Sequence, residues 1–461
     1  MRKHLSASRL ARRDVLKLLV AGGLGPLGAA RAPSAATAAP AATSQAAKAT
    51  WDWKKYSGQT IRVLVYTGAT TDFVDKVLGE FTELTGIRVS WEKMGEDQQR
   101  QKLQVELTSR MTDLDVYMSH TGQQGKAFMQ AGWYEPLEPL INDTKMTNPD
   151  WDHADFDANL LEELGAVDKK LVGILMYAIT FPLYYRKDLF QEAGISVPKT
   201  FEEMEAAAKK LTDKSKGQFG MFLRGQPAAA VGVWAAFLYN FGGAWLAADG
   251  KAQVNSAETV ASIDYYGRLA REYGPPGAIN LNWAQLADLF AQGRGAMFCD
   301  SSSLVVRWED PQKSRVIDKV GYALLPGGKG GQQPALNTPL WALYAKSKKK
   351  EAAWTFIQWA AGKDMCARMQ RTGITQPRKS AWQDAQFQKE FGAKHPDFTD
   401  TLLQSFAKGK AYLYPPFINV AQARDIYGEV IAASILGHDV KAAANAAQAK
   451  LLDQQKKEAA G

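Results

Sequence analysis

This sequence contains no apolar run long enough to cross a bilayer. The early apolar stretch, residues 18–30, is broken by Pro26 and four glycines, and a membrane-spanning helix needs about 20 apolar residues. Cysteine is nearly absent, since Cys299 and Cys366 are the only two in 461 residues. Their scarcity excludes a disulfide-rich scaffold and leaves two alternatives, a pair of buried free thiols or a single disulfide.

Sequence patterns typical of catalysis and metal binding are missing as well. The motifs HExxH, CxxC and GxSxG do not occur, and the glycine-rich residues 326–331 depart from the P-loop order. The five histidines never fall at a metal-ligand spacing; they are His4, His120, His153, His395 and His438. We therefore expect neither a metal nor a cofactor, and we expect that the protein is not an enzyme.

Residues 1–32 have the organisation of a cleavable export signal: a basic segment, a short apolar run, and small residues around Arg31. The run from Arg12 to Lys17, RRDVLK, resembles a twin-arginine signal. An ordinary secretory signal is the alternative. No cysteine follows the expected cleavage site, so we predict a soluble periplasmic protein without a lipid anchor. Residues 33–50 are rich in alanine, proline, serine and threonine, which predicts a disordered leader.

The positive charge of the chain is concentrated in this leader. The formal net charge is +8, but residues 1–32 hold seven of the 56 Lys and Arg and one of the 48 Asp and Glu. Residues 33–461 therefore carry a formal net charge of only +2. A charge so close to neutral gives no reason to expect nucleic acid as a partner.

The folded part begins near Trp51 with a pattern of alternating strands and helices. Residues 61–66 and 87–92 are typical of buried strands, and between them apolar residues recur at helical spacing from an N-cap at Thr71 to Gly86. A strand, a helix and a strand within about 30 residues form a βαβ unit, which implies a mostly parallel sheet covered by helices.

Further elements continue this α/β pattern. We predict a helix over residues 97–110, a short strand over 115–119, and a helix that begins with a capping box at Thr200. An extended run over residues 171–185 is interrupted at 180–182. Such an interruption is typical of a chain that crosses from one lobe to another.

Three segments, in this order, resemble family 1 extracellular solute-binding proteins. Residues 167–204 are similar to the part of that family that crosses to the second lobe, and residues 287–303 are similar to its helix-to-strand turn before a binding loop. Residues 337–382 resemble the segment that returns to the first lobe. With the early βαβ unit, these landmarks cover about residues 60–430.

The resemblance implies a two-lobe α/β fold in which each lobe is a mostly parallel sheet flanked by helices. A hinge of two or three strands would join the lobes, and the ligand would bind in the cleft between them. The implied first lobe comprises residues 51–178 and 335–376. The implied second lobe comprises residues 179–334 and 377–461.

Ligand-binding candidates follow from the strand ends and from the resemblance. In open α/β sheets ligands bind at the carboxyl ends of strands, and flat aromatic rings suit sugar rings. Asp300 would accept hydrogen bonds from two hydroxyl groups, and Trp341, one of 13 tryptophans, would provide the stacking face. The candidates are Tyr66, Thr67, Ser119, His120, Thr121, Ile179, Thr180, Arg224, Asp300, Ser301, Ser303, Trp341 and Phe417.

These features predict a binding protein for a sugar or polyol that serves the permease subunits of an ABC importer. We expect a monomer. The serine, histidine and threonine after residues 115–118 replace residues frequent in oligosaccharide-binding members, which favours a monosaccharide, disaccharide or polyol. One alternative is an anionic solute, such as a sugar phosphate or sugar acid, held by Arg224, Arg378 or Arg424. The other is a secreted carbohydrate-active hydrolase on a similar frame.

Overall fold

The computed structural model describes residues 51–109 and 112–460, and the expected export signal and leader lie outside this range. A first sheet has the strand order β2-β1-β3-β13-β6, in which β1 is parallel to β2 and β3 while β13 is antiparallel to β3 and β6. Its strands are β1 (Thr60–Tyr66), β2 (Arg88–Met94), β3 (Val116–Ser119), β6 (Ile174–Leu175) and β13 (Leu340–Leu343).

A second sheet has the order β11-β8-β10-β9, with β9 parallel to β10 and β8 antiparallel to both of its neighbours. These strands are β8 (Leu183–Arg186), β9 (Phe219–Phe222), β10 (Gly295–Cys299) and β11 (Val320–Ala323). A short hairpin joins β4 (Ala166–Val167) and β5 (Lys170–Leu171). The two-lobe α/β fold expected from the sequence is confirmed. The expectation of mostly parallel sheets is wrong, because two of the four pairings in the first sheet and two of the three in the second are antiparallel.

The start of the helix that follows β1 differs from the prediction, and the difference affects how the chain is held at the end of β1. Helix α1 begins at Ala69 with Gly68 as its N-cap, so Thr71 lies inside the helix instead of capping it. The Thr71 hydroxyl accepts a hydrogen bond from the Gly68 N–H at 2.9 Å and donates one to the Tyr66 carbonyl at 2.8 Å. Both bonds fix the chain where β1 ends. The predicted stop at Gly86 is confirmed, with a left-handed φ of 71°.

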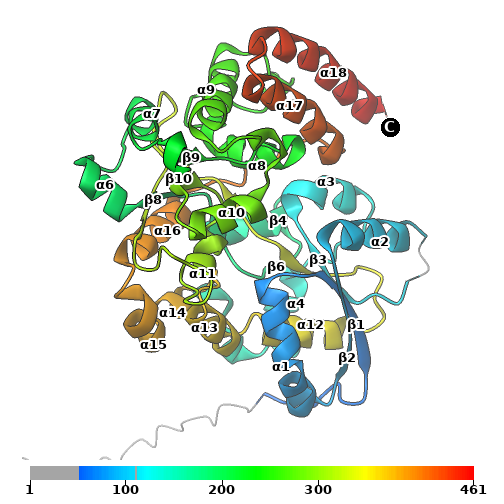
Figure 1. Ribbon diagram of the computed structural model, residues 1–461. Helices are drawn as coiled ribbons and strands as arrows, with labels where there is room; N and C mark the ends of the chain where they lie inside the picture. Colours follow the sequence, from blue (N-terminus) through cyan, green and yellow to red (C-terminus); the bar gives the residue numbers. More distant parts are fainter. Residues whose placement is uncertain (1–50, 110–111, 461) are drawn as a thin grey trace, which may run out of the picture. The chain divides into compact units, whose positions relative to one another are not determined.

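Helices cover both sheets, and α8, α9, α17 and α18 pack against one another beside the second sheet (Figure 1). The helices before the crossing are α1 (Ala69–Thr85), α2 (Glu96–Ser109), α3 (Thr121–Gln130), α4 (Glu138–Asn142) and α5 (Ala158–Leu160). Between the crossings lie α6 (Lys187–Ala193), α7 (Phe201–Lys210), α8 (Pro227–Leu238), α9 (Ala257–Tyr273), α10 (Trp283–Ala291) and α11 (Val305–Trp308). The remaining helices are α12 (Lys350–Ala360), α13 (Lys363–Arg371), α14 (Lys379–Trp382), α15 (Ala385–Phe387), α16 (Pro396–Lys408), α17 (Val420–Ile435) and α18 (Val440–Ala460).

Short 3-10 and π turns connect several of these elements. They are η1 (Pro149–Trp151), η2 (His153–Asp155), η3 (Leu161–Gly165), η4 (Lys214–Lys216), η5 (Ala278–Asn280), η6 (Ser302–Leu304) and η7 (Gln388–Gly392). Thr200 caps α7 as predicted, by accepting from the Glu203 N–H. The predicted capping box does not form, because the Glu203 carboxylate accepts from the Lys199 N–H instead of from that of Thr200. No helix in the described part of the chain combines the length and the apolar character that crossing a membrane requires.

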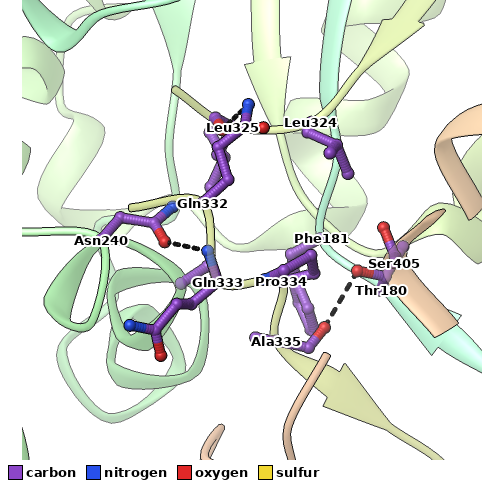
Figure 2. Close-up of a pocket in the computed structure, with 11 residues that line it drawn as sticks. Thr180, Phe181, Asn240, Leu324, Leu325, Gln332, Gln333, Pro334, Ala335 and Ser405 are labelled. Carbon is purple, nitrogen blue, oxygen red and sulfur yellow. Dashed lines mark hydrogen bonds between the residues drawn. The ribbon is translucent and has the colours of Figure 1, made fainter. Parts of the chain in front are cut away.

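The chain passes from the first sheet to the second through β7 (Ile179–Thr180) and returns through β12 (Leu336–Asn337), and these two strands pair antiparallel. The Thr180 hydroxyl donates to the Ala335 carbonyl at 3.0 Å, and the Asn240 side chain accepts from the Gln333 N–H at 2.7 Å (Figure 2). The first bond joins the two passages, and the second holds the returning segment to the residues after α8. Both lie at a cavity of only about 10 Å³, about the smallest that can hold one water. The residue limits of the lobes remain a prediction.

Buried apolar side chains form three clusters in the described residues. One lies among α8, α9, α17 and the second sheet, another joins side chains of both sheets, and the third packs α1 and α12 against the first sheet. Cys299 and Cys366 are buried free thiols, which decides against the disulfide alternative. Burial raises the pKa of the Cys366 thiol to about 12, so this thiol stays protonated.

Candidate functional site

A cavity of about 490 Å³ lies where the strand ends of both sheets meet the crossing segments. Its volume is within the range of ligand pockets, about 300–1,000 Å³. The first-sheet side contributes the segment after β1 and the residues that open α2 and α3. The second-sheet side contributes the segments after β9 and β10, with α11 and α17. The polar and aromatic lining residues are Tyr66, Thr67, Thr70, Asp72, Glu96, His120, Gln123, Tyr177, Arg224, Trp283, Ser301, Ser303, Arg307, Asn337, Thr375, Tyr414 and Arg424.

Seven of the 13 predicted site residues line this cavity, and six do not. The seven are Tyr66, Thr67, His120, Ile179, Arg224, Ser301 and Ser303. The six that lie outside the lining are Ser119, Thr121, Thr180, Asp300, Trp341 and Phe417. The role of all 13 residues in binding remains a prediction, but the structure does not bring the second group to the lining of this cavity.

Trp341 does not offer a stacking face to the cavity. Its side chain is fully buried on the helix-covered face of the first sheet, with its ring 5.4 Å from that of Phe356 and 6.2 Å from that of Trp91. Phe417 is likewise part of the core around α17. Because alternate side chains of a strand point to opposite faces, strand position alone did not show which face Trp341 takes.

Asp300 supports the cavity wall from behind. Its carboxylate is fully buried and accepts two hydrogen bonds from Arg224, at 2.8 and 2.5 Å, and a third from the Ser301 N–H at 2.6 Å. Its oxygens are therefore occupied by the protein, and a ligand hydroxyl would meet Arg224 instead. Burial opposes the charge on Arg224, but Asp300 outweighs it and raises the pKa of the guanidinium. Asp300 thus orients Arg224.

Three of the predicted residues use their hydroxyl groups for hydrogen bonds within the protein: Ser119, Thr121 and Thr180. Ser119 lies 2.6 Å from the Tyr134 hydroxyl, Thr121 donates to the Leu164 carbonyl at 2.7 Å, and Thr180 holds the crossing strands. These residues were predicted from the strand-end rule, which locates the backbone but not the direction of each side chain. The three residues therefore hold neighbouring segments in place and do not line the cavity.

His120 and Tyr66 form a polar pair at the ends of β3 and β1. The His120 Nε2 lies 2.9 Å from the Tyr66 hydroxyl, and the two rings are nearly parallel. Burial lowers the pKa of His120 to about 4. The imidazole is therefore neutral at pH 7, with one nitrogen that donates and one that accepts hydrogen bonds. A neutral donor and acceptor of this kind suits a hydroxyl group.

We expect the stability of the protein to decrease as the pH falls from 6.5 to 4. Since His120 has a lower pKa in the folded protein than the 6.5 of a free histidine, protonation favours the unfolded chain over this interval. The loss due to this residue is on the order of 3 kcal/mol. Urea unfolding at pH 4 and pH 7 would measure it. His120→Gln should reduce the pH dependence, and the exposed control His438→Gln should leave it unchanged; equal slopes for all three proteins would contradict the prediction.

Several lining residues were not predicted. Glu96 lies two residues after the end of β2, so the strand-end rule applied to that strand could have found it. Trp283, which is 38% exposed, lies at the start of α10 with the Arg307 guanidinium 5.0 Å from its ring centre. Tyr177 lies shortly before β7, and Asn337 is the last residue of β12. No local pattern marks these last two as ligand residues.

Contacts across the cavity rim bring distant segments together. The Gln123 side chain donates to the Tyr414 hydroxyl at 3.1 Å, and Lys126 donates to the Pro416 carbonyl at 3.2 Å. Tyr414 in turn lies under the Arg424 guanidinium, 5.2 Å from its ring centre. Residues of α3 and of the segment before α17 thus form one wall, although about 290 residues separate them.

Most charges in the cavity are already paired. Asp72 pairs with Lys93, Glu96 with Arg100, and Arg307 with Asp288. Arg224 pairs with Asp300. In contrast, Arg424 has no carboxylate within ion-pair distance among the described residues, and its Nε is buried without a hydrogen-bond partner. Arg378, the third arginine considered for an anionic solute, lies elsewhere, buried against Asp155 and the ring of Phe156.

The chain is similar over most of its length to known binding proteins. It is 27% identical over 393 residues to a probable amino-acid ABC transporter periplasmic-binding protein of Sinorhizobium fredii, covering 82% of this chain and 85% of that protein. It is 26% identical to the erythritol/L-threitol-binding protein of Mycolicibacterium smegmatis, with 94% of each chain covered.

A crystal structure of an ABC transporter solute-binding protein from Agrobacterium radiobacter K84, in complex with ribitol, has the same fold. It superposes with a TM-score of 0.78 at 30% identity and covers 86% of this chain and 99% of that one. The profile of the bacterial extracellular solute-binding protein family matches residues 67–365. Since this match extends over more than half of the chain, the protein belongs to the family of bacterial extracellular solute-binding proteins.

Proposed function

We propose that the protein captures a short polyol or a small sugar in the 490 Å³ cavity and delivers it to the permease subunits of an ABC importer. The observation that carries this proposal is the composition of the cavity wall. Neutral hydrogen-bonding groups and aromatic residues line it, while four of its charged side chains are paired with protein groups. Hydroxyl groups bind to such a wall without requiring a full counter-charge.

Two kinds of contact support a polyol. Tyr66, His120 and Asn337 offer neutral donors and acceptors, and Arg224, held by Asp300, offers directed N–H groups. Tyr177 and Trp283 offer ring faces to the C–H side of the ligand. The relatives named for erythritol and threitol and the structure that holds ribitol support the same ligand class.

Arg424 favours one alternative. An arginine that faces the cavity without a carboxylate partner would suit the carboxylate of a sugar acid, or that of an amino acid, as the name of the Sinorhizobium fredii relative suggests. Arg424 nevertheless has a hydrogen bond to the Ala228 carbonyl and an aromatic ring beside it. We therefore rank a neutral polyol first and keep the anionic solute as the second candidate.

Isothermal titration calorimetry with the purified protein tests the proposal. We expect erythritol, ribitol or mannitol to bind with a Kd near 1 μM, equivalent to about −8 kcal/mol, and to be recovered unchanged. Tyr66→Phe, which removes one cavity hydroxyl, should weaken binding by about tenfold. Tyr239→Phe, outside the cavity lining, is the matched control. Binding of ribonate or an amino acid, but of no neutral polyol, would replace the proposal by the anionic alternative, and turnover of the ligand would indicate a hydrolase.

We further propose that the protein acts in the periplasm as a monomer, without nucleic acid and without catalysis, after cleavage of a twin-arginine signal within residues 1–32. The family to which it belongs supports an extracellular location. N-terminal sequencing of the protein recovered from the periplasm, with and without replacement of Arg12 and Arg13 by lysine, would test the signal. Export that does not depend on the two arginines would favour the ordinary secretory route.

A further inference from the structure

A second group of polar side chains lies apart from the cavity. Glu309, Asp318 and His395 each place one potential ligand atom within 4.8 Å of the other two. Glu309 directly follows α11, Asp318 lies just before β11, and His395 is the N-cap residue of α16. These three residues come from separate segments of the chain, which explains why no metal-ligand spacing was visible in the sequence.

Two buried polar atoms of this group have no hydrogen-bond partner among the described residues. His395 is only 2% exposed, yet no hydrogen bond from a described residue reaches its Nδ1. The Glu309 Oε1 is also buried without a partner, while its Oε2 lies 3.3 Å from the His395 Nε2. Leaving buried polar atoms without partners costs about 1–3 kcal/mol each. An ion bound beside the His395 Nε2 would give the Glu309 carboxylate a partner, although not the His395 Nδ1, which lies on the other side of the ring.

The imidazole of His395 is held in place by aromatic rings. Phe391 lies 4.7 Å away, centre to centre, and the ring of Tyr322 meets it edge-on at 6.0 Å. The backbone N–H of His395 donates to the Phe391 carbonyl at 3.0 Å, which fixes the backbone as well. A histidine fixed in this way loses little further freedom on binding a ligand.

We propose that Glu309, Asp318 and His395 form a binding site for a divalent metal ion such as Zn²⁺. Zinc prefers one imidazole nitrogen and carboxylate oxygens at about 2.0–2.2 Å, and tetrahedral ligands at that distance lie about 3.3–3.5 Å apart. The 3.3 Å between the Glu309 Oε2 and the His395 Nε2 matches this edge, which makes Nε2 the nitrogen that would bind the ion. Two carboxylates also balance the charge of the ion. Asp318 is exposed, so the ion can enter from solvent and keep a water as its fourth ligand.

A metal ion bound at this second group would stabilise one wall of the solute cavity. Val306 and Arg307 of α11 line that cavity, and Glu309 follows two residues later. A bound ion would join the end of α11 to β11 and to α16, far along the chain. Since no ligand of the ion lines the cavity, metal binding and solute binding are separable, and the metal site does not depend on the proposed function.

Metal binding by the full-length protein tests this proposal. After treatment with EDTA and removal of the chelator, titration with Zn²⁺ should show one equivalent bound and a rise in the melting temperature. Co²⁺ should give the intense visible absorption of a four-coordinate site. His395→Gln and Glu309→Gln should each weaken Zn²⁺ binding by on the order of 100-fold or more. The control His438→Gln removes an exposed histidine outside the group and should not change it.

Because two variants are tested, His395→Gln and Glu309→Gln, the experiment still gives an answer if one of them folds poorly. Each is first compared with the parent protein in EDTA by circular dichroism, so that loss of the fold is distinguished from loss of the metal site. The proposal is wrong if the folded parent binds no stoichiometric Zn²⁺. It is equally wrong if His395→Gln and Glu309→Gln retain the parent affinity, because the ion is then adventitious.

Discussion

Replacing Asp300 by asparagine is expected to lower the free energy of unfolding by about 3–5 kcal/mol and to weaken solute binding strongly. Asp300 is fully buried and accepts both hydrogen bonds of the Arg224 fork. Asparagine keeps the shape but removes the charge, so Arg224 is left as a buried cation without a partner. Its N–H groups then no longer point into the cavity. Urea unfolding and calorimetric titration with the best-binding polyol measure the two effects.

Glu80→Gln is the matched control for this substitution. Glu80 also accepts two hydrogen bonds from one guanidinium, that of Arg368, at 2.7 and 2.9 Å, but at a position where the carboxylate is exposed. Solvent screens that pair, so we expect a loss of at most about 1 kcal/mol. The double variant Asp300→Asn with Arg224→Gln should recover part of the lost stability, because no unpaired charge remains. Equal losses from Asp300→Asn and Glu80→Gln would show that burial does not govern these pairs.

The parts of the fold that were predicted are those fixed by neighbouring residues. Apolar alternation located β1 and β2 within one or two residues, and Gly86 marked the end of α1 because the chain turns there with a positive φ. The strand-end rule then placed Tyr66, Thr67 and His120 at the cavity. These predictions rest on patterns among residues that are close together in the sequence, and such patterns can be recognised without a structure.

The parts that were not predicted depend on contacts between distant segments. Tyr414 and Arg424 reach the cavity only because α17 packs against α8, almost 200 residues earlier in the chain. The metal site proposed here is assembled in the same way from three segments. The face chosen by Trp341 is also a long-range property, since both faces of β13 are buried and local alternation does not distinguish them.

Trp341→Ala is expected to lower the free energy of unfolding by about 3–5 kcal/mol while leaving the affinity for the solute nearly unchanged. The indole is fully buried against Phe356 and Trp91, so its removal leaves a cavity in the core that the sheet and α12 cannot close. Because the indole does not line the cavity, its effect on binding should be small. Trp341→Phe, which fills most of the space, should cost less and provides a folded protein for calorimetry if the alanine variant unfolds.

Trp283→Ala is expected to have the opposite effects, a small change in stability and a loss of affinity for the solute. Trp283 lines the cavity and is 38% exposed, so its loss should change stability by no more than about 0.5 kcal/mol. The ligand, however, loses a ring face worth about 0.5–1.5 kcal/mol, or up to about tenfold in Kd. If Trp341→Phe weakened binding more than Trp283→Ala at similar stability, the stacking face would lie at Trp341 after all, and the assignment of the cavity would be wrong.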